Sequence, residues 1–299
     1  MRRAAADQGR RGVLRFAAAL AATGFGPPAY AAQATGAQPA GTSGGGRGRL
    51  KQSVSRWCFG KMSLDELAGH AARIGYRGID LLGPDEWAAP RRHGLVCALA
   101  MLGAPVTIEK GLNRVENHPP ILEALRRAID LAAEAQVPNI VCFSGNRAGL
   151  SDEEGLESCA RGLVQLAGQA EKKGVTLCVE LLNSKVDHKD YMADHTAWGV
   201  ALVKKVGSPR VKLLYDIYHM QIMEGDVIRT IRENAEWIAH FHTAGVPGRH
   251  DIDGSQELNY GAICRAIADT GYAGFLAQEF VPAGDPLRAL EQAFRTCDV

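Results

Sequence analysis

The second half of this 299-residue chain contains four apolar, strand-like runs that each end in a side chain able to bind a metal ion. A carboxylate at the end of a buried strand is costly unless it is paired, and a cation is one way to pair it. Three carboxylates and one imidazole suit Mn²⁺ or Mg²⁺ better than a metal that prefers thiols. The sequence therefore predicts one divalent-metal site with the ligands Glu180, Asp216, His242 and Glu279.

The spacing of these four residues indicates how a fold can bring them together. The intervals from 180 to 216, from 216 to 242 and from 242 to 279 are 36, 26 and 37 residues. Each interval is about one strand and one helix long. Because the carboxyl ends of all strands in a parallel barrel meet at one rim, we expect the four ligands there.

The predicted metal site favours proton-transfer chemistry on a small substrate. A carbonyl and a neighbouring hydroxyl can chelate the ion, which then stabilises the enediolate that forms when a C–H proton leaves. Two carboxylates beside the substrate can take the proton from one carbon and return it to the next. We therefore predict that Glu180 and Glu279 are the catalytic pair as well as metal ligands.

Three further residues near these strand ends are candidates for substrate binding. His219 comes three residues after Asp216 and can reach a substrate oxygen. Arg249 lies in the loop after the seventh expected strand and can hold a carboxylate in a two-pronged contact. Glu257, in the stretch Glu257-Leu-Asn-Tyr260, is a weaker candidate in the same connection.

The elements that must position these side chains alternate along the chain from residue 51 to 299. Eight strand-like runs, each followed by a helix-like segment, predict an α/β fold, a single-domain (β/α)8 TIM barrel. A doubly wound open sheet is the alternative, but no Gly-x-Gly-x-x-Gly follows the first run. The expected strands cover residues 54–59, 78–82, 95–101, 139–143, 175–180, 211–216, 237–242 and 274–279.

The first fifty residues have the parts of an export signal. Arg10 and Arg11 form a twin-arginine pattern, an apolar segment follows at 17–25, and small residues surround Tyr30 as in a cleavage site. We predict a twin-arginine signal peptide at 1–31 and a flexible Gly-, Ala- and Ser-rich linker at 32–50. The protein is then periplasmic or otherwise exported by the Tat route, and cytoplasmic if the start is misassigned.

Bulk composition narrows the classes of partner. The net charge is +1 and the pI is about 7.7, which gives no basic track for nucleic acid and no reason to expect membrane binding after signal removal. No two of the seven cysteines are separated by only two residues, so a zinc ribbon is not indicated. We expect a small-molecule substrate, a hydroxy-oxo acid or a sugar, and allow for a homo-oligomer.

Longer motifs between about residues 54 and 285 point to a known family. The most specific are Tyr215-Asp-Ile-Tyr-His-Met-Gln221, Val246-Pro-Gly-Arg-His250 and Glu257-Leu-Asn-Tyr260. In these motifs the chain resembles the hydroxypyruvate isomerase family within the xylose isomerase-like TIM barrels. The resemblance implies that Glu180 and Glu279 are the acid/base pair, that Asp216 and His242 complete the metal site, and that hydroxypyruvate is converted to tartronate semialdehyde.

Other functions remain open from the sequence. A ketose 3-epimerase uses the same enediolate chemistry, and such relatives carry histidine at the position of His242. A nuclease of the endonuclease IV type shares the barrel but needs a three-zinc cluster with more histidines than this site offers. An exported sugar-binding module without turnover is a remote alternative, disfavoured because both glutamates are present.

Overall fold

The computed structural model describes residues 48–299. The predicted signal peptide, and the linker up to residue 47, lie outside the described residues. The end of the predicted linker belongs to the folded domain: the Gly48 N–H donates to Asp298 Oδ1 at 2.7 Å, the Arg49 N–H donates to the Val299 carbonyl, and Leu50 is buried. The domain thus includes residues before the expected start at 51.

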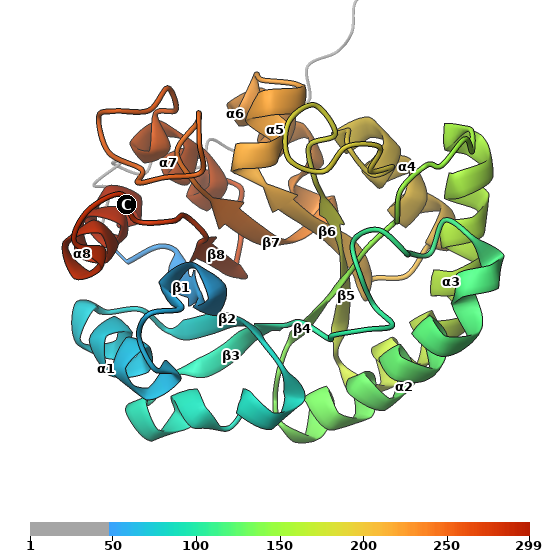
Figure 1. Ribbon diagram of the computed structural model, residues 1–299, viewed down its shortest axis with the longest axis horizontal. Helices are drawn as coiled ribbons and strands as arrows, with labels where there is room; N and C mark the ends of the chain where they lie inside the picture. The colour runs from blue at the N-terminus through green and yellow to red at the C-terminus, as the bar shows by residue number, and fades with distance from the viewer. Residues whose placement is uncertain (1–47) are drawn as a thin grey trace, which may run out of the picture. The chain divides into compact units, whose positions relative to one another are not determined.

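Eight parallel strands form a closed barrel in which each strand pairs with its sequence neighbours and β1 pairs with β8 (Figure 1). This arrangement confirms the predicted (β/α)8 TIM barrel. The strands are β1 (Lys51–Ser55), β2 (Gly78–Leu82), β3 (Val96–Ala100), β4 (Asn139–Cys142), β5 (Thr176–Leu181), β6 (Val211–Asp216), β7 (Ile238–Thr243) and β8 (Phe275–Gln278).

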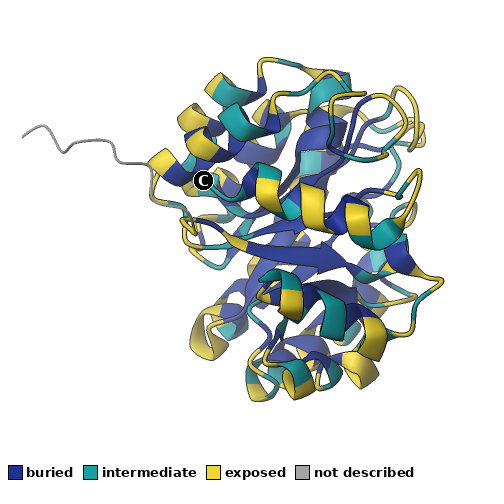
Figure 2. Cartoon of the chain, turned by 90° about the vertical axis from the view of Figure 1, so that its left-hand side faces the viewer, coloured by how far each residue is buried: buried dark blue, intermediate teal, exposed yellow. Residues whose placement is uncertain are grey.

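Helices surround the strands, and their outward faces carry most of the exposed residues while the strands are buried (Figure 2). No helix in the described part of the chain is long and apolar enough to span a membrane. The helices are α1 (Leu64–Ile74), α2 (His118–Glu134), α3 (Asp152–Lys173), α4 (Thr196–Val206), α5 (Ile217–Met223), α6 (Val227–Asn234), α7 (Tyr260–Asp269) and α8 (Pro286–Cys297).

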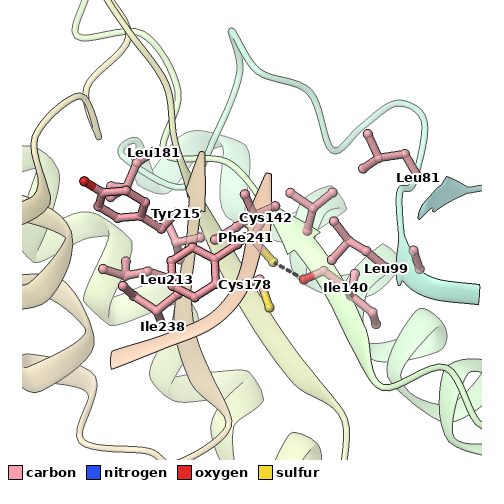
Figure 3. Close-up of a cluster of buried hydrophobic side chains, with 14 of the residues drawn as sticks. Leu81, Leu99, Ile140, Cys142, Cys178, Leu181, Leu213, Tyr215, Ile238 and Phe241 are labelled. Atoms are coloured by element: carbon pink, nitrogen blue, oxygen red, sulfur yellow. Dashed lines mark hydrogen bonds between the residues drawn. The ribbon is translucent and has the colours of Figure 1, made fainter. Parts of the chain in front are cut away.

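Apolar side chains of the strands form much of the hydrophobic core. Leu99, Ile140, Cys178, Leu213 and Phe241 come from five successive strands and lie in one apolar cluster (Figure 3). Parallel strands are apolar on both faces because helices cover the outside and packed side chains fill the inside. This burial fixes the strand register and therefore the positions of the polar strand ends.

The first strand is shorter than the sequence suggested. β1 ends at Ser55, and the remainder of the expected strand 54–59 forms a 3-10 turn, η1 (Arg56–Phe59). That turn carries Trp57 over the rim, where its Nε1–H donates to Glu279 Oε1 at 2.6 Å. The error arose because the apolar residues Trp57 to Phe59 continue the strand-like pattern although the backbone turns.

A partly buried ion pair joins the loop after β4 to the loop after β5. Arg147 Nη2 lies 2.9 Å from Asp194 Oδ1 and also donates to the Met192 carbonyl. Burial alone would raise the pKa of Asp194, but hydrogen bonds from Arg147, Ser184 and His195 hold that pKa below its usual value. Arg147 therefore ties two rim loops together.

Replacement of Asp194 by asparagine should destabilise the fold by about 2 kcal/mol near neutral pH, because Arg147 loses its charged partner. Since the folded-state pKa of Asp194 is depressed, the contribution is present above the unfolded-state pKa of about 3.9 and is lost as pH falls through the folded-state value. Urea unfolding of Asp194→Asn and of the control Asp152→Asn, an exposed partner of the same arginine, measures this. Equal effects of the two substitutions at neutral pH would contradict the prediction.

Candidate metal centre

The four predicted ligands come together at the carboxyl-terminal rim of the barrel. Glu180 lies in β5, Asp216 ends β6, His242 lies in β7, and Glu279 follows β8 directly. One donor atom from each lies within 4.8 Å of the donor atoms of the other three. His242 Nδ1 is 2.6 Å from Glu279 Oε2 and 3.5 Å from Glu180 Oε1.

Strand register explains why these side chains share one side of the sheet. Asp216 and His242 are direct Cα partners between β6 and β7. His242 is the partner of Ala277, and Glu279 stands two residues further along the chain, whereas Glu180 is the partner of Leu214, two residues before Asp216. Because strand side chains alternate with a period of two, all four point to the barrel interior.

Asp216 also begins a helix, which divides its two carboxylate oxygens between two tasks. Oδ1 caps α5 by accepting the backbone N–H groups of Tyr218 at 2.9 Å and His219 at 3.4 Å. Such a cap satisfies N–H groups that have no partner inside the helix. Oδ2 then faces the site, where it lies 2.8 Å from Arg249 Nη2.

Arg249 contacts two of the predicted metal ligands, although the sequence predicted a contact with substrate only. Its guanidinium pairs with both Asp216 and Glu279 and lies over the ring of Tyr218, with 4.8 Å from Cζ to the ring centre. The sequence assigned Arg249 to a substrate carboxylate. The structure places it at the same rim, but its partners are two carboxylates of the protein.

The other two predicted substrate contacts differ in their positions. His219 is buried, and its Nε2 lies 3.6 Å from Asp216 Oδ2, so it belongs to the site. Glu257 is exposed in the connection from β7 to α7 and accepts a hydrogen bond from Gln221. It is not among the converging groups, and its contact with substrate stays a prediction.

Burial and charge push the pKa values of the two predicted catalytic glutamates apart. Burial raises the pKa of Glu180 to about 7, and the nearby Glu279 charge adds to this, although His242 acts against it. Burial also acts to raise the pKa of Glu279, but the positive charges of Arg249 and His242 outweigh it and lower that pKa well below the usual range. Opposite shifts in neighbouring carboxyl groups are typical of an acid and a base.

A second polar layer lies beneath the cluster. Asp80, from β2, is fully buried; its Oδ2 is hydrogen-bonded with His240 Nε2 and lies 3.5 Å from His242 Nε2. Burial alone would raise the pKa of Asp80, but the two imidazoles lower it to about 2. The sequence signal was the single carboxylate inside the apolar run 78–82. His240 belongs to the same layer, with its ring centre 5.2 Å from that of His242.

The donor set fits a divalent ion that prefers oxygen ligands. Three carboxylates meet one imidazole nitrogen, and no cysteine lies among the four converging side chains. Within the described chain, His242 Nδ1 and Nε2 are buried without a well-aligned hydrogen bond, as suits a ring held for another partner. The described residues can therefore hold one Mn²⁺ or Mg²⁺ ion, or another metal with similar preferences.

Comparison with known proteins agrees with the fold. A family model described as xylose isomerase-like TIM barrel matches residues 68–297. A putative hydroxypyruvate isomerase of Mus musculus is 30% identical over 81% of this chain and 92% of its own length. A 2-oxo-tetronate isomerase of Cupriavidus necator is 31% identical over 73% of this chain and 87% of its own length.

Solved structures show the same barrel. A crystal structure titled AP endonuclease, family 2, from Brucella melitensis superposes with a TM-score of 0.71 and 25% identity, covering 81% of this chain and 97% of that one. A D-psicose 3-epimerase superposes with a TM-score of 0.65 over 82% of this chain and 90% of that one, at 19% identity, a level that supports the fold alone.

Removal of any one of the four converging ligands should weaken Mn²⁺ binding at least about tenfold, since each supplies one bond to the ion. Asp216→Asn is the most informative change, because the amide keeps an oxygen that can still cap α5. Titration calorimetry with Mn²⁺ alone compares this variant with Glu257→Gln, which should retain the wild-type dissociation constant. Equal weakening by the two changes would place the metal elsewhere.

Proposed function

The chain belongs to the xylose isomerase-like TIM barrel family, and from that premise we propose that it isomerises hydroxypyruvate to tartronate semialdehyde through an enediolate. Its curated relatives of about 30% identity are named hydroxypyruvate and 2-oxo-tetronate isomerases, so the chain is an isomerase of the oxo-acid type. The proposal adds the substrate, the metal and the roles of individual residues.

The observation that carries the proposal is the opposed pair Glu180 and Glu279. Their side chains approach His242 Nδ1 from β5 and from the end of β8, so a small substrate held at this rim would have both carboxyl groups within reach. Both carboxyl groups are therefore available for proton transfer, one to take a proton and the other to return one. One glutamate takes the C3 proton and the other returns a proton to C2, while the proton of the C3 hydroxyl passes to the C2 oxygen.

We assign the converging carboxylates and His242 to one Mn²⁺ or Mg²⁺ ion. When bound, the ion supplies Lewis-acid polarisation of the substrate's carbonyl and hydroxyl oxygens. The chain's own residues set the geometry. Trp57 donates to Glu279 Oε1, which leaves Oε2 facing the site, and Asp80 contacts the side of the His242 ring that faces away from the site.

Positive charge at the rim favours an acidic substrate. Arg249 is largely shielded from water, with a side-chain exposure of 15%, and its guanidinium reaches the cluster. Once a divalent ion neutralises Asp216 and Glu279, this guanidinium is free to bind a substrate carboxylate in two-pronged fashion. This supports hydroxypyruvate over a neutral ketose.

A ketose 3-epimerase is the second candidate. The same acid and base would remove and return a proton at one carbon of a longer, neutral sugar. The feature in its favour is His242, because ketose 3-epimerases of the family that the sequence motifs resemble carry histidine at this position. Activity on ketoses without activity on 2-oxo acids would favour it.

We also propose that the protein works outside the cytoplasm, carried there by the Tat route through Arg10 and Arg11. Replacing both arginines by lysine should retain the protein in the cytoplasm, because the route reads the arginine pair. Fractionation of cells that express the full chain measures this. Periplasmic recovery of the doubly substituted protein would refute Tat export.

Turnover of hydroxypyruvate should depend on Mn²⁺ or Mg²⁺ and should incorporate solvent deuterium at carbon in D₂O, because the proton passes through a carboxyl group. Glu279→Gln should lower the exchange rate at least about 100-fold, since the amide cannot accept the proton. Glu134→Gln, an exposed change at the end of α2, is the control and should exchange at the wild-type rate. Proton NMR of the substrate follows the exchange.

A panel of 2-oxo acids and ketoses should accompany this assay. Absence of C–H exchange in every substrate tested, with either metal, would rule out the isomerase mechanism written above. Exchange in ketoses alone would keep the mechanism and change the substrate.

A further inference from the structure

Two of the seven cysteines, Cys264 and Cys297, come from neighbouring helices and meet in the core. Cys264 lies in α7, and Cys297 is the last residue of α8. Both side chains are fully buried and belong to the same apolar cluster. Because α7 and α8 pack against each other, the two thiols approach from adjacent elements.

The two thiols are hydrogen-bonding partners of each other. The contact with the Cys297 thiol, and then burial, raise the pKa of Cys264 well above its usual value, because both disfavour the thiolate. Thiols in hydrogen-bond contact belong to side chains that already face each other. Facing side chains at short range are the first geometric requirement of a disulfide.

The other five cysteines are arranged differently. Four are buried and donate to backbone carbonyl groups at 3.5 to 4.0 Å: Cys97, Cys142, Cys159 and Cys178. Cys142 and Cys178 lie on adjacent strands (Figure 3), but the register places Cys178 opposite Val141, and each thiol donates to a carbonyl of its own strand. Cys58 is partly exposed in η1. Thiol-to-thiol contact therefore distinguishes the pair in α7 and α8.

Metal binding is the other chemistry that paired thiols serve in proteins. Such a site needs at least three protein ligands around the ion. In the described part of the chain, the groups of side chains that can hold a metal contain aspartate, glutamate and histidine but no cysteine. Without a third ligand, the pair is suited to oxidation.

The pair lies near the place where the barrel closes. β1 pairs with β8, and the Arg49 N–H donates to the carbonyl of Val299, two residues after Cys297. The segment between the two cysteines contains β8 and Glu279. A covalent bond from α7 to α8 would enclose this segment in a loop and hold the last helix against the barrel.

We propose that Cys264 and Cys297 form a disulfide under oxidising conditions, and that this bond stabilises the contact of α8 with the barrel. Formation of the bond in the cell rests on the proposed export, because disulfides persist outside the reducing cytoplasm. The capacity to form it rests on the two thiols alone and is independent of the isomerase activity.

The reaction is thiol–disulfide exchange with a disulfide oxidant. Cys297 loses its thiol proton to solvent, and its sulfur attacks one sulfur of the oxidant, which releases a thiolate and leaves a mixed disulfide. Cys264 then loses its proton and attacks the Cys297 sulfur, which releases the second thiolate. The cysteines thus lose two electrons and two protons, and the oxidant becomes two thiols. Because both cysteines are buried, the last turn of α8 must open first, as helix ends do more readily than helix interiors.

The bond is tested on the full chain, purified with its thiols reduced and then incubated with oxidised glutathione. Thiols are counted by alkylation in denaturant, and peptide mapping by mass spectrometry identifies any crosslink. The protein should lose two of its seven thiols and yield one linked peptide pair, Cys264 with Cys297. Retention of all seven thiols, or a crosslink between other cysteines, would overturn the proposal.

The stabilising effect is measured as the difference in Tm between the oxidised and the reduced protein. Oxidation should raise Tm by about 5 to 10 °C, because the bond closes a long loop of the unfolded chain. Cys297→Ser should abolish this difference, whereas the control Cys58→Ser, at a partly exposed thiol, should retain it. Equal Tm values for the two wild-type forms would refute the stabilising role. The wild-type measurements remain decisive even if Cys297→Ser does not fold.

Thiol counts on protein taken directly from cells separate the disulfide from the proposed export. Exported wild type should have Cys264 and Cys297 protected from alkylation, and the chain with Arg10 and Arg11 replaced by lysine should have all its thiols free. If the purified protein forms the bond but the wild type stays reduced in the cytoplasm, export fails and the disulfide assignment stands. Exported wild type with both thiols free would overturn the disulfide.

Discussion

Three carboxylates are buried at one rim and need positively charged partners. The other groups of the site provide those partners or hold them in place. Desolvating even one carboxylate without a partner is costly, and grouping three adds mutual repulsion. In this structure His242 and Arg249 supply the positive charge directly. A divalent cation would supply the same positive charge at a single point. The cluster is therefore interpreted as a metal centre rather than as a stabilising ion-pair network.

The barrel makes this costly arrangement possible. Apolar packing between strands and helices fixes the register, so that Asp216 and His242 stand side by side and their neighbours follow at intervals of two. Supporting hydrogen bonds then occupy the far side of each polar group: the helix start behind Asp216, Trp57 behind Glu279, and Asn183 behind His219. Each functional group therefore presents one defined atom to the interior.

The sequence predicted which residues end the strands, but it did not predict where the side chains of the loops point. The four converging residues could be found because apolar runs ending in Glu180, Asp216, His242 and Glu279 repeat at the spacing of a strand-helix unit, and one parallel barrel brings such ends together. Trp57 was assigned to a strand because an apolar turn has the same pattern as a strand, and the direction of the loop residue Glu257 has no sequence signal. The contact of Asp80 with His240 joins distant segments, which no single run of residues shows.

The most direct test of the central claim is a crystal structure of the protein grown with Mn²⁺, with the ion located by its anomalous scattering. The account predicts one strong peak bonded to Glu180, Asp216, His242 and Glu279, between the two glutamates. A peak bound elsewhere, or an ion that leaves any of these four side chains uncoordinated and directed away from it, would contradict the account.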